Sequence, residues 1–319
     1  MIREHSLLSS WQFSWDLNRE ASFSAIPLMP RKQIRQQTVF LIYARRNLPS
    51  TRPLVSRSCP TNTEKVPAVE FRNVSFVYAS RRNYNVLHDL NLKIQKGESV
   101  GVIGASGCGK STIVALLERF YDVNLGQILI EGTSLTSLDV RHNRSHIDLV
   151  SQDTMLFQGS LRDNILFGLP DDKASAPDAV ERIERACRSV NMYDFIVSLP
   201  EGYSTDVANC RVALSGGQRQ RLAIARHWPA NRLLLFDEAT SALDTANEAL
   251  VQQAIESVTH QQPDRTTIAV AHRLSTIRRC DHIFVLHAGQ VVEEGTHELI
   301  EKRGRYYTMF LAQSLDREA

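Results

Sequence analysis

The sequence predicts an α/β fold built around a mainly parallel sheet. Short apolar runs alternate along the chain with stretches of helical pattern: Ser99–Ile103 precedes Ser111–Phe120, and Leu233–Phe236 precedes Thr245–Val258. Such runs are typical of strands buried on both faces, and their alternation with helices is typical of parallel sheets that helices cover. A glycine-rich turn joins the first run to its helix. With 319 residues, 43% of them hydrophobic, the chain can bury a sizeable core.

Further elements lie around this pattern. Two half-buried strands are predicted near its start, because apolar residues recur there at strand spacing: Val69, Phe71, Phe76 and Tyr78, then Leu90, Leu92 and Ile94. Thr267–Val270 and Ile283–Leu286 add two more short strands. In the middle, residues from about 155 to 214 are polar, have a helical pattern at Ala179–Met192 and contain no strand-like run. We therefore expect a helical subdomain inserted into the α/β core.

The first 66 residues differ from the rest in charge and pattern. They show no sustained helical or strand period, and prolines such as Pro27, Pro30 and Pro49 interrupt them. Residues 1–65 carry ten Lys and Arg against four Asp and Glu, a net charge of +6, so the other 254 residues carry −4. We expect a basic, disordered leader over 1–66, a globular domain over 67–314 and a short tail over 315–319.

Composition excludes several classes of protein. A total charge of +2 argues against a general nucleic-acid binder. No run without Asp, Glu, Lys or Arg exceeds eleven residues, whereas a membrane span needs about 20 apolar residues, so we expect that this chain does not cross a bilayer by itself. Five scattered cysteines with no CxxC indicate neither a disulfide framework nor a zinc site.

The glycine-rich turn is a candidate phosphate site. Its nine residues match the pattern GxxxxGK[ST] between a strand and a helix, and they are Gly104, Ala105, Ser106, Gly107, Cys108, Gly109, Lys110, Ser111 and Thr112. Glycines let backbone N–H groups curl around a phosphate at the positive end of the helix. Lys110 can reach the β- and γ-phosphates of a nucleotide, and the Ser111 hydroxyl can bind Mg²⁺. The same setting predicts a lowered pKa for the Cys108 thiol.

Two acidic residues end a later apolar strand. Asp237 and Glu238 follow Leu233–Phe236, which places their carboxylates at the carboxyl edge of the sheet, where ligands bind in open α/β folds. We expect Asp237 to hold Mg²⁺ through water. Glu238 would face the γ-phosphate and polarise the attacking water.

A second anion-binding device lies between these two motifs. In Leu214-Ser215-Gly216-Gly217-Gln218, Ser215 is a candidate helix N-cap, and two glycines let backbone N–H groups approach an anion at the helix start. One γ-phosphate does not need two such cradles from one subunit. The arrangement makes sense if each chain offers its Ser215–Gln218 cradle to the nucleotide of a neighbouring subunit.

Together these motifs resemble one family. The ordered set GASGCGKST, LVSQD, LSGGQRQR, LLLFDEATSALD and AVAHRLST is similar to the nucleotide-binding domains of ABC transporters, over about Val69–Ser314. LLERFYD, SLRDNILFG and the ending GRYYTMFLAQSL resemble multidrug-resistance exporters, in particular the C-terminal ATP-binding half of fungal multidrug or pheromone exporters. The resemblance implies a P-loop NTPase fold of ABC type, with N-terminal antiparallel strands and an inserted helical subdomain.

The resemblance also implies roles for matching residues. Tyr78 would stack on adenine, Gln152 would sense Mg²⁺ and water, Asp244 would cross a dimer interface, and His272 would hydrogen-bond the γ-phosphate and orient Glu238. The expected catalytic residues are thus Glu238, His272, Lys110 and Gln152, and the expected Mg²⁺ ligands are Ser111, Gln152 and Asp237. Gln152–Gly159 would receive the coupling helix of a membrane domain.

The implied function is an ATPase of an exporter. Two such domains, identical or different, would close head to tail around two Mg-ATP molecules and drive efflux of a small molecule or peptide, at the cytoplasmic face of a membrane. Two alternatives stay open: a truncated remnant that binds ATP without transport, and a soluble ABC ATPase acting on ribosomes or DNA. Proteins of the last kind usually carry two ATPase domains or a long coiled coil, and neither is present.

Two segments depart from the family pattern. Residues 206–213, before the Ser215 motif, lack the usual glycine-bearing stretch, which puts communication with a membrane domain in doubt. Residues 226–232 replace a longer helical run, and Pro229 should end that helix early.

Overall fold

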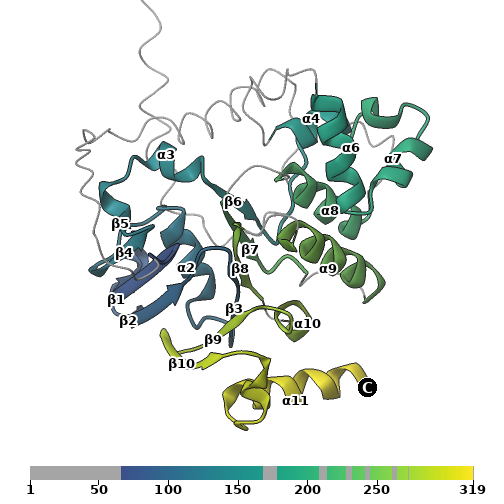
Figure 1. Ribbon diagram of the computed structural model, residues 1–319. Coiled ribbons are helices and arrows are strands. Elements are labelled where there is room, and N and C mark those ends of the chain that lie inside the picture. Colours follow the sequence, from purple (N-terminus) through teal and green to yellow (C-terminus); the bar gives the residue numbers. More distant parts are fainter. Residues whose placement is uncertain are drawn as a thin grey trace, which may run out of the picture. The chain divides into compact units, whose positions relative to one another are not determined.

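The computed structural model describes residues 66–167, 178–207, 214–227, 232–240, 245–260, 264–271 and 273–318 (Figure 1). The predicted leader, apart from Val66, lies outside these ranges. Among the helices in these ranges, none is long and apolar enough to span a membrane.

A six-stranded sheet forms the centre of the fold. Its strand order is β10 (Gln290–Gly295), β9 (His282–His287), β3 (Ser99–Gly104), β8 (Thr266–Val270), β7 (Leu233–Asp237) and β6 (Ile147–Val150). All neighbouring strands are parallel except β10 and β9. The predicted mainly parallel sheet is therefore confirmed. Sequence reasoning missed its two outer strands, β6 and β10.

A second, antiparallel sheet contains the strands predicted near residue 69. Its order is β2 (Asn85–Ile94), β1 (Val69–Val77), β4 (Leu125–Ile130) and β5 (Thr133–Ser134). Val69 pairs with Ile94 and Phe71 with Leu92, so the alternating apolar residues fall on one face. The expected N-terminal antiparallel strands are confirmed, and β4 and β5 join them.

The alternating side chains of the central strands divide the core into two main clusters. Leu233 and Leu235 of β7 pack with α2 (Lys110–Leu117) and the antiparallel sheet. Leu234 and Phe236 of the same strand pack on the other face, with α8 (Gly216–Arg226) and α9 (Thr245–His260). This two-faced burial explains the continuous apolar sequence of β7.

The helical pattern of the middle segment becomes several short helices. They are α4 (Leu161–Leu166), α6 (Ala179–Ser189) and α7 (Tyr193–Ser198), and they share an apolar cluster with α8 and α9. Ser160 caps α4 by accepting from the Asp163 backbone N–H, and Asp163 returns the contact. The helical region therefore shares one apolar cluster with the α/β core and does not form a core of its own.

The remaining described helices are short or lie at the C-terminus. They are α3 (Val140–Arg144), α10 (Leu274–Ile277), α11 (Arg305–Glu318) and the 3₁₀ turns Ala79–Arg81, Leu135–Ser137, Gly202–Ser204 and His297–Ile300. The last helix thus runs past residue 314, where the sequence predicted the domain to end.

One glycine lets α10 approach the central sheet. A Cβ atom on Gly101 of β3 would lie 2.0 Å from Cγ2 of Ile277, a fully buried and stiff side chain. We expect Gly101→Ala to lower the free energy of unfolding by about 1–3 kcal/mol, because overpacking a tight core displaces its neighbours. Thermal unfolding of this variant measures the effect. The matched control is Gly107→Ala, whose Cβ would meet no atom within 4 Å but whose φ of +77° adds strain, so a larger loss at Gly107 would contradict the packing argument.

Candidate active site

The order of the central strands brings the predicted motifs to one edge of the sheet. Val270 of β8 pairs with Val102 of β3 on one side and with Asp237 of β7 on the other. The glycine-rich loop therefore leaves β3 close to where Asp237 and Glu238 leave β7. Gln152 follows β6, the next strand, by two residues, and is exposed. Four predicted site residues or segments, far apart in the sequence, thus share the carboxyl edge of parallel strands.

The loop between β3 and α2 has the backbone that phosphate binding requires. Gly107 and Gly109 have φ values of +77° and +106°, a conformation that favours glycine. Ala105, Ser106 and Gly107 are exposed. Gly109 is the N-cap of α2, and no side chain caps this helix end. Backbone N–H groups at the start of α2 are therefore available to an anion.

Lys110 is buried within this loop, with 4% of its surface exposed. Its Nζ donates to the carbonyl oxygens of Gly104, at 2.9 Å, and Ala105, at 3.0 Å. No ion pair joins Lys110 to a carboxylate in the described part of the chain. A buried ammonium held only by carbonyl groups keeps its positive charge uncompensated, which favours an anionic ligand beside it.

Ser111 and Asp237 meet across 126 positions of sequence. The Ser111 hydroxyl donates to Oδ1 of Asp237 at 2.9 Å. A hydroxyl and a carboxylate are oxygen ligands that suit Mg²⁺, which usually takes one or two protein oxygens and keeps several waters. The described residues contain no group of three or more His, Cys, Asp or Glu arranged to hold a metal.

Glu238 leaves β7 in an unusual backbone conformation. Its φ is +53°, in the left-handed region that non-glycine residues seldom adopt. Its backbone N–H donates to the Val270 carbonyl of β8 at 2.8 Å, which holds the turn. Strained residues fixed by their surroundings are concentrated at functional sites, so the conformation agrees with a specific role for Glu238.

Tyr78 lies beside the helix that follows the phosphate loop. Its hydroxyl and that of Thr112 are 3.0 Å apart and form a hydrogen bond. Its ring contacts Phe76 and Tyr121 edge to face, with centroid distances of 4.8 and 5.1 Å. The structure thus places Tyr78 next to the loop, and its stacking on adenine stays a prediction.

The Ser215 motif begins α8, as predicted. Oγ of Ser215 accepts from the backbone N–H of Gln218 at 3.2 Å, and Oε1 of Gln218 accepts from the backbone N–H of Ser215 at 2.8 Å. Gly216 is exposed, and a Cβ atom on Gly217 would lie 2.5 Å from Oδ1 of Asn247. α8 packs against α4, α6 and α9, whereas α2 packs against β3 and β7, so the two anion-binding devices belong to different parts of the fold.

Several expected residues lie outside the described ranges. They are His272, Asp244, residues 208–213 and Pro229. α8 does end at Arg226, three residues before Pro229, in agreement with the expected early stop.

The expectation for Cys108 is wrong. This residue is only 6% exposed, and burial raises the pKa of its thiol, although the Lys110 ammonium acts in the opposite direction. Desolvation of the thiolate outweighs the nearby positive charge. Cys108 therefore fills space at the base of the loop as a neutral thiol.

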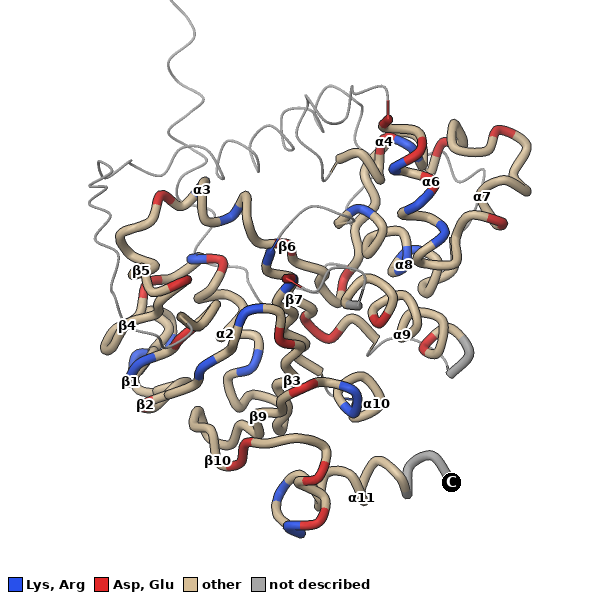
Figure 2. Tube along the Cα trace, viewed as in Figure 1, with Lys and Arg blue, Asp and Glu red and all other residues tan. Residues whose placement is uncertain are grey.

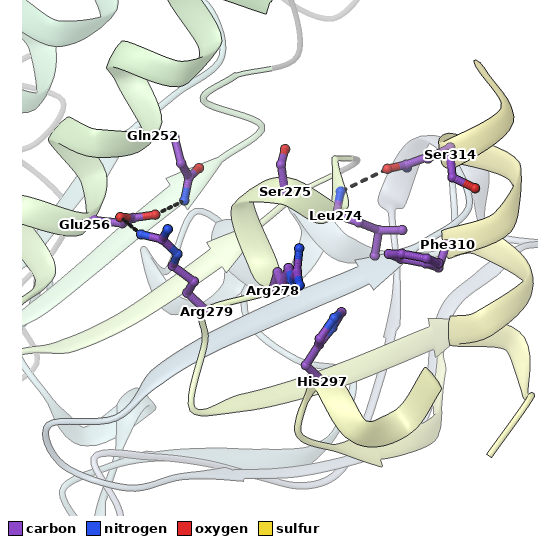
Figure 3. Close-up of a pocket in the computed structure, with 10 residues that line it drawn as sticks. Gln252, Glu256, Leu274, Ser275, Arg278, Arg279, His297, Phe310 and Ser314 are labelled. Atoms are coloured by element: carbon purple, nitrogen blue, oxygen red, sulfur yellow. Dashed lines mark hydrogen bonds and ion pairs between the residues drawn. The ribbon is translucent and has the colours of Figure 1, made fainter. Parts of the chain in front are cut away.

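A cavity of about 620 Å³ lies between α9, α10 and α11 (Figure 3). Leu274, Ser275, Arg278 and Phe310 are among the residues that line it. None of its lining residues belongs to the phosphate loop, to Asp237–Glu238 or to the Ser215 motif. The cavity is therefore not the predicted nucleotide site.

Sequence reasoning assigned no role to the first turn of α9. There, Asn247 lies against Gly217, and Glu248 accepts hydrogen bonds from Arg273 and Ser275. The only signal in the sequence was that Glu248 lies in the first turn of a predicted helix. Acidic residues are common at that position because they interact favourably with the helix dipole, so the signal did not indicate a site. Only the fold shows what this carboxylate contacts.

Comparison with known proteins supports the predicted resemblance. The family described as "ABC transporter" matches residues 87–241. The chain is 56% identical over 263 residues to "ABC multidrug transporter MDR5" of Trichophyton rubrum, covering 82% of this chain and 20% of that protein. It is 49% identical over 249 residues to "ABC multidrug transporter atrD" of Emericella nidulans, covering 77% of this chain and 18% of that protein.

A solved structure shares the fold. It is described as a bacterial Atm1-family ABC exporter with ATP bound, and it matches with a TM-score of 0.69 and 36% identity, over 89% of this chain and 48% of that one. The chain spans about a fifth of the length of the curated relatives that it matches.

Proposed function

The chain belongs to the ABC transporter family as a nucleotide-binding domain of exporter type, and from this premise we propose that it binds Mg-ATP and hydrolyses its terminal phosphate bond. One observation carries the proposal. The glycine-rich loop, the Lys110 ammonium that donates to two carbonyl oxygens and the Ser111–Asp237 hydrogen bond meet at one edge of the parallel sheet. A cation, free N–H groups and oxygen ligands at that edge suit a triphosphate with its Mg²⁺.

The residues divide the chemistry among them. Lys110 and the N–H groups of residues 104–112 bind the β- and γ-phosphates. Ser111, Asp237 and Gln152 would hold Mg²⁺, which when bound neutralises charge on the phosphate oxygens. Glu238 orients and polarises the attacking water, and His272 hydrogen-bonds the γ-phosphate. Catalysis on this scheme is positioning and charge stabilisation, since phosphoryl transfer requires little covalent participation by the protein.

The second cradle supports a shared site. Ser215, Gly216, Gly217 and Gln218 lie at the start of α8, which packs against α4, α6 and α9, whereas α2 packs against β3 and β7. We expect them to contact the γ-phosphate bound by another nucleotide-binding domain, identical or different, in a head-to-tail pair. Closure on ATP and opening after hydrolysis would supply the work of transport.

The exporter assignment extends to the membrane partner. Residues Gln152–Gly159 would receive a membrane domain, and within them Met155 is 60% exposed, an apolar side chain available for a partner. The domain would then act at the cytoplasmic face of a membrane in efflux of a small molecule or peptide. In this scheme the ATP-binding domain covers 67–314, with the helical subdomain at about 155–214.

Charge is distributed without a dominant sign in the part of the chain that the structure describes. Lys and Arg residues are interspersed with Asp and Glu residues along it (Figure 2). This distribution supports protein and nucleotide partners over the nucleic-acid alternative, since a nucleic-acid surface needs clustered positive charge.

The concentration dependence of ATP hydrolysis tests the shared site. We expect the rate of the purified chain to rise with the square of its concentration while monomers predominate, because each active site needs two chains. The measurement is phosphate release at saturating Mg-ATP over a wide range of protein concentrations. A strictly linear rise would contradict the shared site, and no hydrolysis at any concentration would favour the remnant that only binds ATP.

A further inference from the structure

A buried carboxylate lies in the first turn of α9. Glu248 is only 7% exposed, and its two oxygens have different partners. Oε1 accepts from the Ser275 hydroxyl at 2.7 Å, and Oε2 pairs with the Arg273 guanidinium. Removing a carboxylate from water is unfavourable unless it is paired and hydrogen-bonded, and Glu248 makes both kinds of contact.

Ser275 lies in the first turn of α10, and Arg273 belongs to the segment that joins β8 to α10. The first residue of this segment, Ala271, donates its backbone N–H to Val102 of β3 at 3.2 Å. Leu274 donates its backbone N–H to Oε1 of Gln313 in α11 at 2.9 Å. Ala271 is thus held by β3, Leu274 by α11, and Arg273 and Ser275 by α9.

The same turn of α9 also contacts the Ser215 motif. The Asn247 side chain lies so close to Gly217 that a Cβ atom there would be 2.5 Å from Oδ1. Adjacent residues of one helical turn therefore contact the start of α8 and the segment after β8. Under the proposed function, the start of α8 faces the nucleotide bound by a partner domain, and the segment after β8 lies next to the nucleotide bound by this chain.

We propose that Glu248 is a positioning residue for ATP hydrolysis: by holding Arg273 and Ser275, it fixes the start of α10, which directly follows in the sequence the expected γ-phosphate ligand His272. This inference rests on the proposed function. Glu248 also forms an ion pair with Arg273, the residue that directly follows His272 in the sequence. Its role is to align and to compensate charge, and it contacts neither nucleotide nor water in the reaction.

The variant Glu248→Gln tests the inference. Its amide oxygen can still accept one hydrogen bond but cannot neutralise Arg273. We expect kcat for ATP hydrolysis to fall about 10- to 100-fold, because a misplacement of about 1 Å at a reacting group has effects of this size. KM and the affinity for Mg-ATP should change little, since the phosphate loop is untouched.

A matched control lies two turns further along the same helix. Glu256 also pairs with an arginine, Arg279, but that partner is 70% exposed. Glu256→Gln should leave kcat close to that of the wild type, because an exposed ion pair contributes little. Equal losses of kcat in the two variants would contradict a specific role for Glu248.

Hydrogen–deuterium exchange separates positioning from folding. In Glu248→Gln, we expect faster exchange in residues 273–277 and unchanged exchange in β3, β7 and the phosphate loop. A fall in melting temperature with parallel losses of ATP affinity and of protection throughout α9 would instead mean a purely structural role, and would overturn the proposal.

Different results would refute the positioning role of Glu248 and the proposed function. If the wild type hydrolyses ATP and Glu238→Gln abolishes it, but Glu248→Gln has wild-type kcat, only the positioning role is refuted. A wild-type chain that hydrolyses no ATP with any partner domain would refute the proposed function together with this inference.

Discussion

Replacing Glu238 by glutamine is expected to lower kcat for ATP hydrolysis by about 10²- to 10⁴-fold, the contribution of a positioned general base. Glu238 follows Asp237 directly, and its φ of +53° and its hydrogen bond to Val270 fix where it leaves the strand. Glutamine has nearly the same shape but cannot polarise the attacking water as a carboxylate does. Binding of Mg-ATP should persist, because Lys110, Ser111 and Asp237 are unchanged.

The retained ATP should trap a closed dimer. Size-exclusion chromatography with Mg-ATP should show Glu238→Gln as a dimer under conditions where the wild type returns to monomer. The matched control is Glu294→Gln, the same chemical change at an exposed position of β10. An unchanged turnover rate in Glu238→Gln would refute the assignment of this residue as the one that orients water.

Two inactive variants are expected to restore activity when they are mixed. Lys110→Met removes the buried ammonium and should weaken Mg-ATP binding by about 1.5–3 kcal/mol, roughly 10- to 150-fold, the range for a hydrogen bond to a charged group. Gly216→Asp puts a negative charge at the exposed start of α8, where the helix dipole favours it but a γ-phosphate does not. Each variant alone should hydrolyse ATP poorly.

In a mixed dimer, one of the two sites regains every intact part. It combines Lys110 from the Gly216→Asp chain with Gly216 from the Lys110→Met chain. Phosphate release from the mixture should therefore exceed that of either variant at the same total concentration. Melting temperatures of both variants check that they are folded. Mixing without any gain would mean that both cradles act on a nucleotide within one chain, or that Gly216 does not face a phosphate.

In the central sheet, sequence patterns predicted the strands whose side chains are buried on both faces, and missed the two strands at its borders. β7 is uniformly apolar because both core clusters cover it. β6, in contrast, has only four residues and includes the buried Asp148. The side chain of Asp148 forms a hydrogen bond with His227, which lies 79 positions later in the sequence. β10 alternates exposed with half-buried residues at the edge. Neither pattern distinguishes a strand from a loop without knowledge of its neighbours.

The candidate site shows the same division. The phosphate loop and the Ser215 cap depend on contiguous residues, and the structure has the expected glycine conformations and the expected cap. Contacts between distant segments, such as Glu248 with Arg273 and Ser275, depend on the fold. The Cys108 thiol was misjudged for a related reason: its neighbour Lys110 is visible in the sequence, but the burial that raises its pKa is not.

The two-faced burial of β7 bears on how the domain unfolds. Successive side chains of this strand complete two different apolar clusters, and the same five residues end in Asp237. Strand β7 therefore takes part both in the packing of the helical region and in the sheet edge that carries Asp237. Neither part can lose its packing while the other keeps its full stability. We therefore expect this part of the chain to unfold cooperatively. If the helical region were excised, its own apolar surface, which Leu234 and Phe236 cover in the intact chain, would be exposed to water.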